Sequence, residues 1–248
     1  MLEAVERFAS GNFVPGRPED LDLEKLGTFN RKPSAEFLQF KWTDSASSIY
    51  QKCLSADSTP GLKIQLGDLT FYAFGAHLET HLSGEPGSLL AHKNGAVCIA
   101  CGEGAIWFSH FREIGDKQIK LPATMLLGHL LHDVPKLKDD PYLEISNSDY
   151  QDIYCEQENE IAFIHFDFYN GAMGTEACLR LLDLIRSAKA RGARMLVLMG
   201  GKDLWSNGID LNLIEQADDP AEAAWENINA IDDLILELIT STDQYVIT

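Results

Sequence analysis

Two cysteines separated by two residues are the first candidates for chemistry in this sequence. Cys98 and Cys101 have the spacing of a zinc or redox pair, and His92 and His110 lie nearby along the chain. However, VCIAC reads as a β-strand, in which side chains three residues apart point to opposite faces. We therefore expect two free thiols and no metal site.

Three histidines were considered as ligands or bases. His129 and His132 would share a helical face, but no third ligand is evident, so we expect them at the surface or partly packed. His165 lies within IAFIHFDF, where it is expected to occupy one face of a strand and not to act as a catalytic base.

The C-terminal acidic cluster has a simple structural reading. Its members are Glu226, Asp232, Asp233 and Glu237, and we expect them on the solvated face of a helix. Trp225 is expected in the core. No Gly-x-Ser-x-Gly elbow, Walker loop or supported Ser/His/Asp arrangement is found.

Composition restricts the partners and the compartment. The 248 residues include 38 acidic and 20 basic ones, giving a net charge of -18, so nucleic acid and anionic membranes are not expected as partners. A phosphorylated ligand remains possible, because backbone N–H groups can hold phosphate. Five scattered cysteines favour a reducing compartment, and no signal or membrane segment is seen. We expect a cytoplasmic protein.

The chain is expected to contain four segments. Residues 1–36 read as a helix and linker. Residues 37–120 contain short strands separated by turn residues, including Asn94-Gly95, which predict a small β-barrel. Residues 121–150, rich in prolines and charges, read as a connector, and residues 151–248 form an α/β part. The predicted fold class is therefore α+β.

The last hundred residues predict alternating strands and helices. A hairpin turning near Glu158-Asn159 is followed by a helix capped by Thr175, with a buried face at Cys178, Leu181, Leu182 and Ile185. The run MLVLM, residues 195–199, predicts a strand buried on both faces, parallel to the strand before the helix. A second helix begins at Asp219-Pro220 and buries a stripe formed by Trp225, Ile228, Ile231, Ile235, Leu238 and Ile239. QYVIT begins another strand, so we expect this domain to be cut short.

Residues from Ile161 onward resemble the crotonase (enoyl-CoA hydratase/isomerase) superfamily. The similarity lies in IAFIHFDFYNGAMGTEACLRLLDLI, in MLVLMGGKDLWSNGIDLNLIE, and in the helix and YVIT that follow. The loop matches the family pattern Gly-Gly-x-x-x-Phe-Ser-Ala-Gly-x-Asp, with Trp205 for the aromatic residue and Asn207 for Ala. Ser206, Gly208 and Asp210 agree with the pattern.

This resemblance implies a coenzyme A site that stabilises a thioester oxyanion with backbone amides. The amide would be that of Ile209, with Gly208 allowing a tight path and Asp210 bonding the loop or beginning the next turn. Ser206 and Asn207 would lie near the adenine. The segment 169–173, with Asn170, Gly171 and Ala172, would lie along the pantetheine arm, although Asn170-Gly171 also reads as a simple turn.

Residues 40–111 resemble the C-terminal β-barrel domain of formyltransferases, and together the two resemblances suggest a specific family. The barrel match consists of Trp42, Ile49, Pro60, Gly61, Leu69, Gly84, Pro86 and Gly87. A formyltransferase barrel followed by a crotonase domain is similar to the HypX (HoxX) hydrogenase-maturation factors. That resemblance implies that the parent enzyme moves a formyl group from formyl-tetrahydrofolate to coenzyme A and releases carbon monoxide. Hydrogenase-maturation proteins are then candidate partners.

The resemblance also predicts what this chain should lack. The formyl-folate domain and the acid/base residues of the crotonase domain are expected to lie outside it. Two alternatives remain open: an acyl-CoA hydratase or isomerase with an unusual N-terminal extension, or a non-catalytic module that binds a partner.

Overall fold

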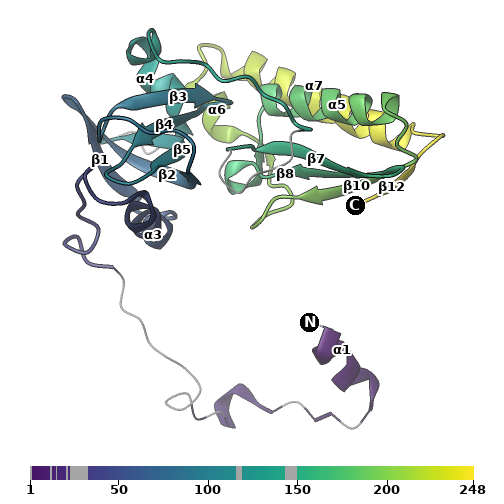
Figure 1. The fold of residues 1–248 in the computed structure, drawn as a ribbon. Coiled ribbons are helices and arrows are strands. Elements are labelled where there is room, and N and C mark those ends of the chain that lie inside the picture. Colours follow the sequence, from purple (N-terminus) through teal and green to yellow (C-terminus); the bar gives the residue numbers. More distant parts are fainter. Residues whose placement is uncertain are drawn as a thin grey trace. The chain divides into compact units, whose positions relative to one another are not determined.

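The computed structural model describes residues 2–11, 13–14, 16–20, 22, 33–115, 119–142 and 150–248. Parts of the expected linker and connector therefore lie outside the described residues. The chain divides into two compact units, Met1–Ser34 and Ala35–Thr248. In the first unit, α1 (Leu2–Ala9) buries none of its side chains. The second unit contains an antiparallel β part and an α/β part (Figure 1).

The β part consists of one helix and a six-stranded antiparallel sheet. The helix α3 (Ala46–Ala56) precedes the strands, which pair in the order β1-β2-β5-β4-β3, with β6 beside β5. Their bounds are β1 Leu62–Leu66, β2 Leu69–Glu79, β3 Leu89–Lys93, β4 Ala96–Ala100, β5 Ala105–Glu113 and β6 Leu121–Pro122. Among the described strands, no ladder joins β1 to β3, so strand pairing alone does not close the small β-barrel that we expected.

The expected Asn94-Gly95 turn connects β3 to β4. Both residues have positive φ, 49° and 82°, as a two-residue hairpin turn of this kind requires. In β4 and the residue after it, Cys98 and Cys101 are buried in two different apolar clusters. The two thiols thus lie on opposite faces, as their spacing predicted, and burial raises the pKa of each.

The start of the expected connector belongs to the β part. Leu121 pairs with Phe111 on β5, and α4 (Ala123–Leu127) buries Ala123 and Leu127 in the same cluster as α3 and the sheet. The apolar residues at the start of this segment therefore complete the core of the β part. A short 3-10 helix, η2 (Gly128–Leu131), follows.

The α/β part has a four-stranded sheet in the order β12-β10-β8-β7. The expected hairpin is present as β7 (Ile153–Glu158) and β8 (Ile161–Phe166), with Asn159 at positive φ in its turn. The next strands, β10 (Met195–Gly200) and β12 (Tyr245–Ile247), run parallel to β8. The crossover helix α5 (Thr175–Ala190) connects β8 to β10, as the sequence predicted.

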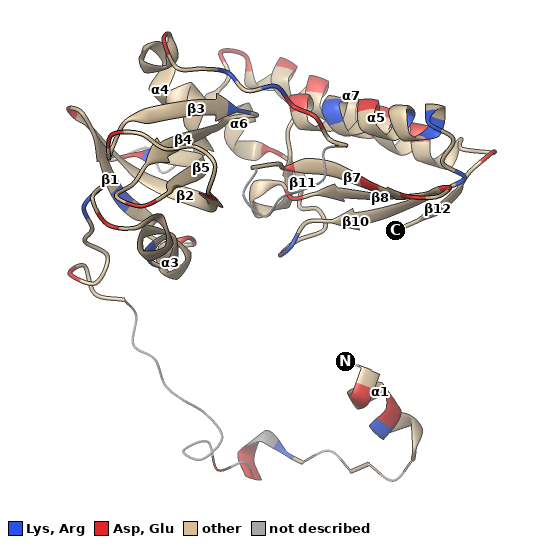
Figure 2. Cartoon of the chain, in the orientation of Figure 1, with Lys and Arg blue, Asp and Glu red and all other residues tan. Residues whose placement is uncertain are grey.

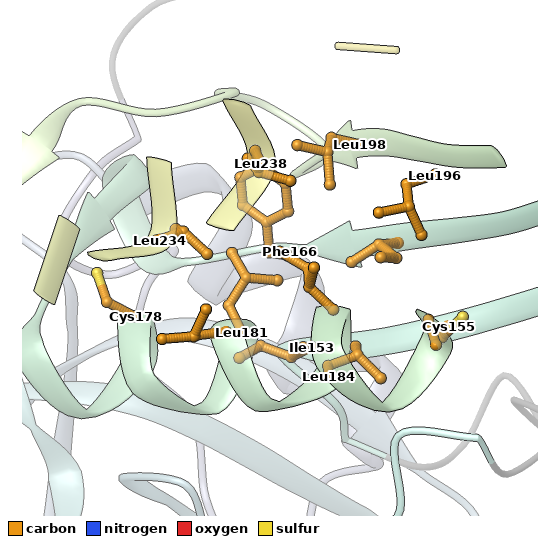
Figure 3. Packing of buried hydrophobic residues seen from close by; sticks show 14 of the residues in the cluster. Ile153, Cys155, Phe166, Cys178, Leu181, Leu184, Leu196, Leu198, Leu234 and Leu238 are labelled. Carbon is orange, nitrogen blue, oxygen red and sulfur yellow. The ribbon is translucent and has the colours of Figure 1, made fainter. Parts of the chain in front are cut away.

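The core of this part lies between one face of the sheet and two helices. Figure 3 shows Leu181 and Leu184 of α5 and Leu234 of α7 (Pro220–Ile239) packed with Leu196 and Phe166 of the sheet. Both α5 and α7 lie on the same side of the strands (Figure 1). The expectation that β10 is buried on both faces is therefore wrong: Leu196 and Leu198 are buried, but Met199 is 45% exposed.

The two helices correct details of the sequence analysis. Thr175 is the first residue of α5 and does not cap it; Gly174 holds the N-cap position, where a Cβ atom would meet Leu213 at 2.9 Å. Asp219 caps α7 as expected. The predicted stripe of α7 is confirmed at Leu238 and at partly buried Ile231, but the other buried side chains are Asn227, Ala230 and Leu234. The expectation that Trp225 lies in the core is wrong, because it is 65% exposed.

The charges on the described helices and their hydropathy agree with what the composition predicted. Acidic residues recur along α7, whereas α5 has both acidic and basic residues (Figure 2), and Glu237 joins these helices through Lys189 Nζ at 2.6 Å and Arg186 Nε at 2.8 Å. Asp232 and Asp233 are exposed, as expected of a solvated helix face. Of the described helices, none has both the length and the apolar character needed to cross a bilayer.

Helix α5 allows a matched test of this core. Leu181 is buried and Leu179, two residues earlier, is 47% exposed. We expect Leu181→Ala to lower the free energy of unfolding by about 3 kcal/mol, because it leaves a cavity. Leu179→Ala should change it by less than about 0.5 kcal/mol. Urea denaturation measures both, and equal effects would contradict the assigned packing.

Candidate functional site

The candidate site is built from two loops that leave neighbouring parallel strands. One loop follows β8 and the other follows β10, and the carboxyl ends of parallel strands meet at one edge of a sheet. Asp167, directly after β8, accepts a hydrogen bond from the amide of Lys202, just after β10, at 3.0 Å. The loops are thus joined where they begin.

The first loop contains the segment expected to lie along pantetheine. Tyr169–Gly171 form a 3-10 turn (η3), in which exposed Asn170 has a φ of 55°. Gly171 is buried, and a Cβ atom there would come within 3.1 Å of the Asn207 amide nitrogen. Its own carbonyl accepts that amide at 2.7 Å. Glycine therefore lets the two loops approach closely.

A two-residue parallel ladder extends this contact. Ala172 and Met173 form β9, and they pair with Gly208 and Ile209, which form β11. Of the eight site residues predicted from the sequence, three lie in this ladder, Ala172, Gly208 and Ile209, and the other five lie beside it on the same two loops. Gly208 has a φ of 81°, in accord with its expected part in a tight path.

Two side chains of the second loop are used to build the loop itself. The Ser206 hydroxyl donates to the Met173 sulfur at 3.0 Å and accepts the Gly208 amide at 3.2 Å. Asp210 is buried and caps α6 (Leu211–Gln216) by accepting the amides of Asn212 and Leu213. Burial raises the pKa of Asp210, although those amides lower it. The sequence analysis expected this turn-forming role for Asp210.

Asn227 of α7, which was not predicted from the sequence, holds the two loops together. Its side chain is 2% exposed; its oxygen accepts the Asp210 amide at 3.0 Å and its nitrogen donates to the Met173 carbonyl at 2.7 Å. An Asn in place of an apolar residue on the buried face of α7 is the signal that would have identified it. That face was misassigned, so the signal was missed.

A cavity of about 390 Å³ lies between the β part and these loops. Asn170, Gly171, Ala172 and Asp210 line it from the α/β side, and Asp57, Gly75 and His110 are among the lining residues of the β part. Ser206 and Trp205 instead line an apolar pocket of about 90 Å³ against α7. Asn207 is exposed at the surface of its loop.

His110 is the most strongly perturbed histidine at this cavity. Its ring stacks on Tyr169 at 4.6 Å between centroids, and its Nδ1 lies 2.9 Å from the Ser109 hydroxyl. Burial, together with the nearby Lys120 ammonium, lowers the pKa of His110 from its ordinary value of 6.5 to about 3. The ring is therefore neutral at pH 7.

The other candidates remain outside this site. Within the described parts of the chain, no cluster of three or more His, Cys, Asp or Glu side chains could hold a metal ion. His132 is exposed beside Asp133, and His165 stacks on Tyr154 at 4.2 Å on the sheet face opposite the helices. Both fit the structural readings given above.

Comparison with known proteins shows what the chain is similar to. The family described as "Formyl transferase, C-terminal domain" matches residues 32–126. The hydrogenase maturation factor HoxX of Bradyrhizobium diazoefficiens is 38% identical over the whole chain, which spans 42% of HoxX. The methionyl-tRNA formyltransferase of Ralstonia nicotianae is 25% identical over 52% of the chain and 39% of its own length.

Solved structures give the same relationship. HypX from Aquifex aeolicus, crystallised with tetrahydrofolic acid, is 39% identical with a TM-score of 0.84, covering 99% of this chain and 43% of HypX. The chain thus spans less than half the length of these relatives. It is a homologue of the HoxX and HypX hydrogenase maturation factors along its length, and it contains a formyltransferase C-terminal domain.

Asn227 and Asn229 provide a matched test of the loop junction. Asn227→Ala removes two buried hydrogen bonds and should lower the free energy of unfolding by about 2–4 kcal/mol. Asn229 bonds only a carbonyl of its own helix, that of Trp225, so Asn229→Ala should cost less than about 0.5 kcal/mol. Chemical denaturation measures the free energy of unfolding of both variants. Similar losses in the two would mean that Asn227 does not join the loops.

The partly buried His110 predicts a pH dependence of stability. The folded-state pKa lies below the unfolded value, so between pH 6.5 and 3 the unfolded chain takes up a proton that the folded chain does not. Lowering the pH from 7 to 5 should therefore reduce the free energy of unfolding of the unaltered protein by about 2 kcal/mol more than it reduces that of the His110→Gln variant. Exposed His132→Gln is the control, and identical losses in all three proteins would refute a buried neutral ring.

Proposed function

We propose that this chain is part of a HypX-type hydrogenase maturation protein and that residues 151–248 contribute a crotonase-type site for coenzyme A thioesters. The homology supports the general role. One observation carries the finer proposal: the pairing of Ala172-Met173 with Gly208-Ile209, which joins the two loops that resemble the ligand-binding loops of crotonases.

The proposed catalytic group is the backbone N–H of Ile209. The amides on either side of Ile209 already have partners near the ladder: the Asn207 amide donates to the Gly171 carbonyl, and the Asp210 amide donates to Asn227, beside the Met173 carbonyl. We propose that the Ile209 amide, which lies between them along the chain, faces the bound ligand. In that position it would donate to the carbonyl oxygen of a bound thioester, which becomes more negative in the transition state.

The remaining residues of the two loops would bind the nucleotide and its arm. Asn170 and Asn207 are exposed and free to meet a ligand from solvent, and Ala172 lies between them on β9. Ser206, Gly208 and Asp210 act mainly by shaping the loop, through the bonds described above. Binding through backbone groups accords with a ligand bearing phosphates and a chain of net charge -18.

The proposed reaction is that of the parent protein. A formyl group from formyl-tetrahydrofolate would pass to coenzyme A and leave as carbon monoxide. Tetrahydrofolate is the ligand of the homologous HypX crystal structure. We assign no folate contact and no acid or base to the described residues. Other proteins of hydrogenase maturation are the proposed partners, and the cytoplasm is the proposed compartment.

Calorimetric titration of coenzyme A into the purified chain tests the site. We expect saturable binding that Gly171→Ala weakens about tenfold or more, because a Cβ atom there presses on the loop of Asn207. Gly192→Ala is the control: this glycine also has positive φ, 91°, but no atom lies within 4 Å of the added Cβ. Absence of heat with millimolar coenzyme A, or equal effects of the two changes, would reject the proposal.

A further inference from the structure

The β part contacts the first loop of the proposed site at an aromatic residue, Tyr169. Its ring stacks on His110 of β5 and lies 6.2 Å from the ring of Phe74 on β2. Its hydroxyl donates to the Asp57 carbonyl at 3.3 Å and accepts a bond from Lys120 Nζ at 2.9 Å. Tyr169 therefore has polar and apolar contacts with four residues of the other part.

Lys120 has an unusual environment for a lysine. Its ammonium group lies 4.1 Å from the centre of the Phe74 ring and within reach of the Asp57 and Ser58 carbonyls, at 3.4 and 3.3 Å. Burial lowers its pKa, and burial also raises the pKa of Tyr169. The hydroxyl is thus protonated at pH 7, so it can accept from Lys120 while it donates to Asp57.

The β part also provides the space that the Tyr169 ring occupies. Gly75 on β2 has a φ of 61°, and a Cβ atom there would lie 3.1 Å from Tyr169 Cδ2 and 2.0 Å from the Ser109 hydroxyl oxygen. The Gly75 amide donates to the Asp57 carboxylate at 2.8 Å. Because Gly75 has no side chain, it leaves room for the Tyr169 ring. Its amide also holds Asp57, whose carbonyl accepts the Tyr169 hydroxyl.

A second set of hydrogen bonds holds the chain beyond the other end of the same loop. Loop 167–174 leads directly into α5, and Arg180 of α5 donates to buried Asp152 through both terminal nitrogens, one at 3.0 Å. Asp152 also accepts the side-chain amide of Asn94, in the β3–β4 turn, at 3.1 Å. The loop is thus tied to the β part near its start and beyond its end.

We propose that the β part positions the coenzyme A loops, and that Tyr169, held by Lys120 and Asp57, is the positioning residue through which it does so. This inference rests on the proposed function for the identity of the ligand. Tyr169 immediately precedes Asn170 and Gly171, and the Gly171 carbonyl holds the Asn207 amide. Release of Tyr169 would loosen the ladder that presents Ile209.

The first test needs no ligand. Amide hydrogen exchange of residues 204–210, read by mass spectrometry, should rise about three- to tenfold in Tyr169→Phe, which loses the hydroxyl but keeps the ring. Lys120→Met should act similarly. Because both changes disrupt one linked set of bonds, the double variant should exceed either single one only slightly. Exchange in the middle of α5, residues 181–185, should not change.

Two controls match these variants. Tyr154→Phe removes a hydroxyl from a tyrosine that also stacks on a histidine, His165, but on the sheet face away from the helices. Lys52→Met removes a lysine of the β part that bonds two carbonyls, those of Phe37 and Gln39. Both should leave exchange in 204–210 unchanged.

The second test is the affinity for coenzyme A, which should fall by a similar factor in Tyr169→Phe and stay constant in Tyr154→Phe. Unchanged exchange in 204–210, or an equal rise in α5, would overturn the positioning role, because the latter marks general destabilisation. If the unaltered chain fails to bind coenzyme A but the exchange pattern is as expected, the proposed ligand is wrong and the coupling of the two parts stands.

Discussion

The arrangement of the α/β part depends on one short junction, where two loops that follow β8 and β10 are joined backbone to backbone. Neither loop could hold this shape alone. Asn170 and Gly208 both have positive φ, and the ladder between the loops is two residues long. Asn227 makes the junction rigid, because its buried amide satisfies a carbonyl of one loop and an N–H of the other.

The β part is tied to the α/β part beside this junction, and both belong to one compact unit, Ala35–Thr248. The first loop is tied by Tyr169 to β2 and β5, and the helix that follows it is tied by Asp152 to the β3–β4 turn. Polar ties of this kind are specific in direction, so they fix the orientation of a surface as well as its distance. A site built from backbone amides needs such orientation, because it has no long side chain that could adjust to the ligand.

Much of this could be predicted from local patterns in the sequence. The β8–α5–β10 crossover, the Asp219 cap, the Asn94-Gly95 turn and the opposite faces of Cys98 and Cys101 follow from periods of 2 and 3.6 and from turn chemistry. The eight candidate site residues were proposed from the loop pattern and its resemblance to a family, and they stay a prediction.

Features set by packing over long distances could not be predicted. The buried face of α7 was assigned to its largest apolar side chains, but small Ala230 and polar Asn227 face the core because they fit against α5 and the loops. Lys120 and Asp57 are single residues without a local pattern, and only the folded chain brings them to Tyr169. The sequence also could not show that β10 is covered by helices on one face only, because an apolar run does not reveal how many faces of a strand are packed.

The most direct measurement of the central claim is NMR of the chain labelled with 15N-isoleucine during titration with coenzyme A and with acetyl-CoA. The account predicts that the Ile209 amide proton moves downfield with acetyl-CoA and much less with coenzyme A, because only the thioester offers a carbonyl oxygen at that position. Equal shifts with both ligands, or an Ile209 signal that does not move while others do, would contradict it.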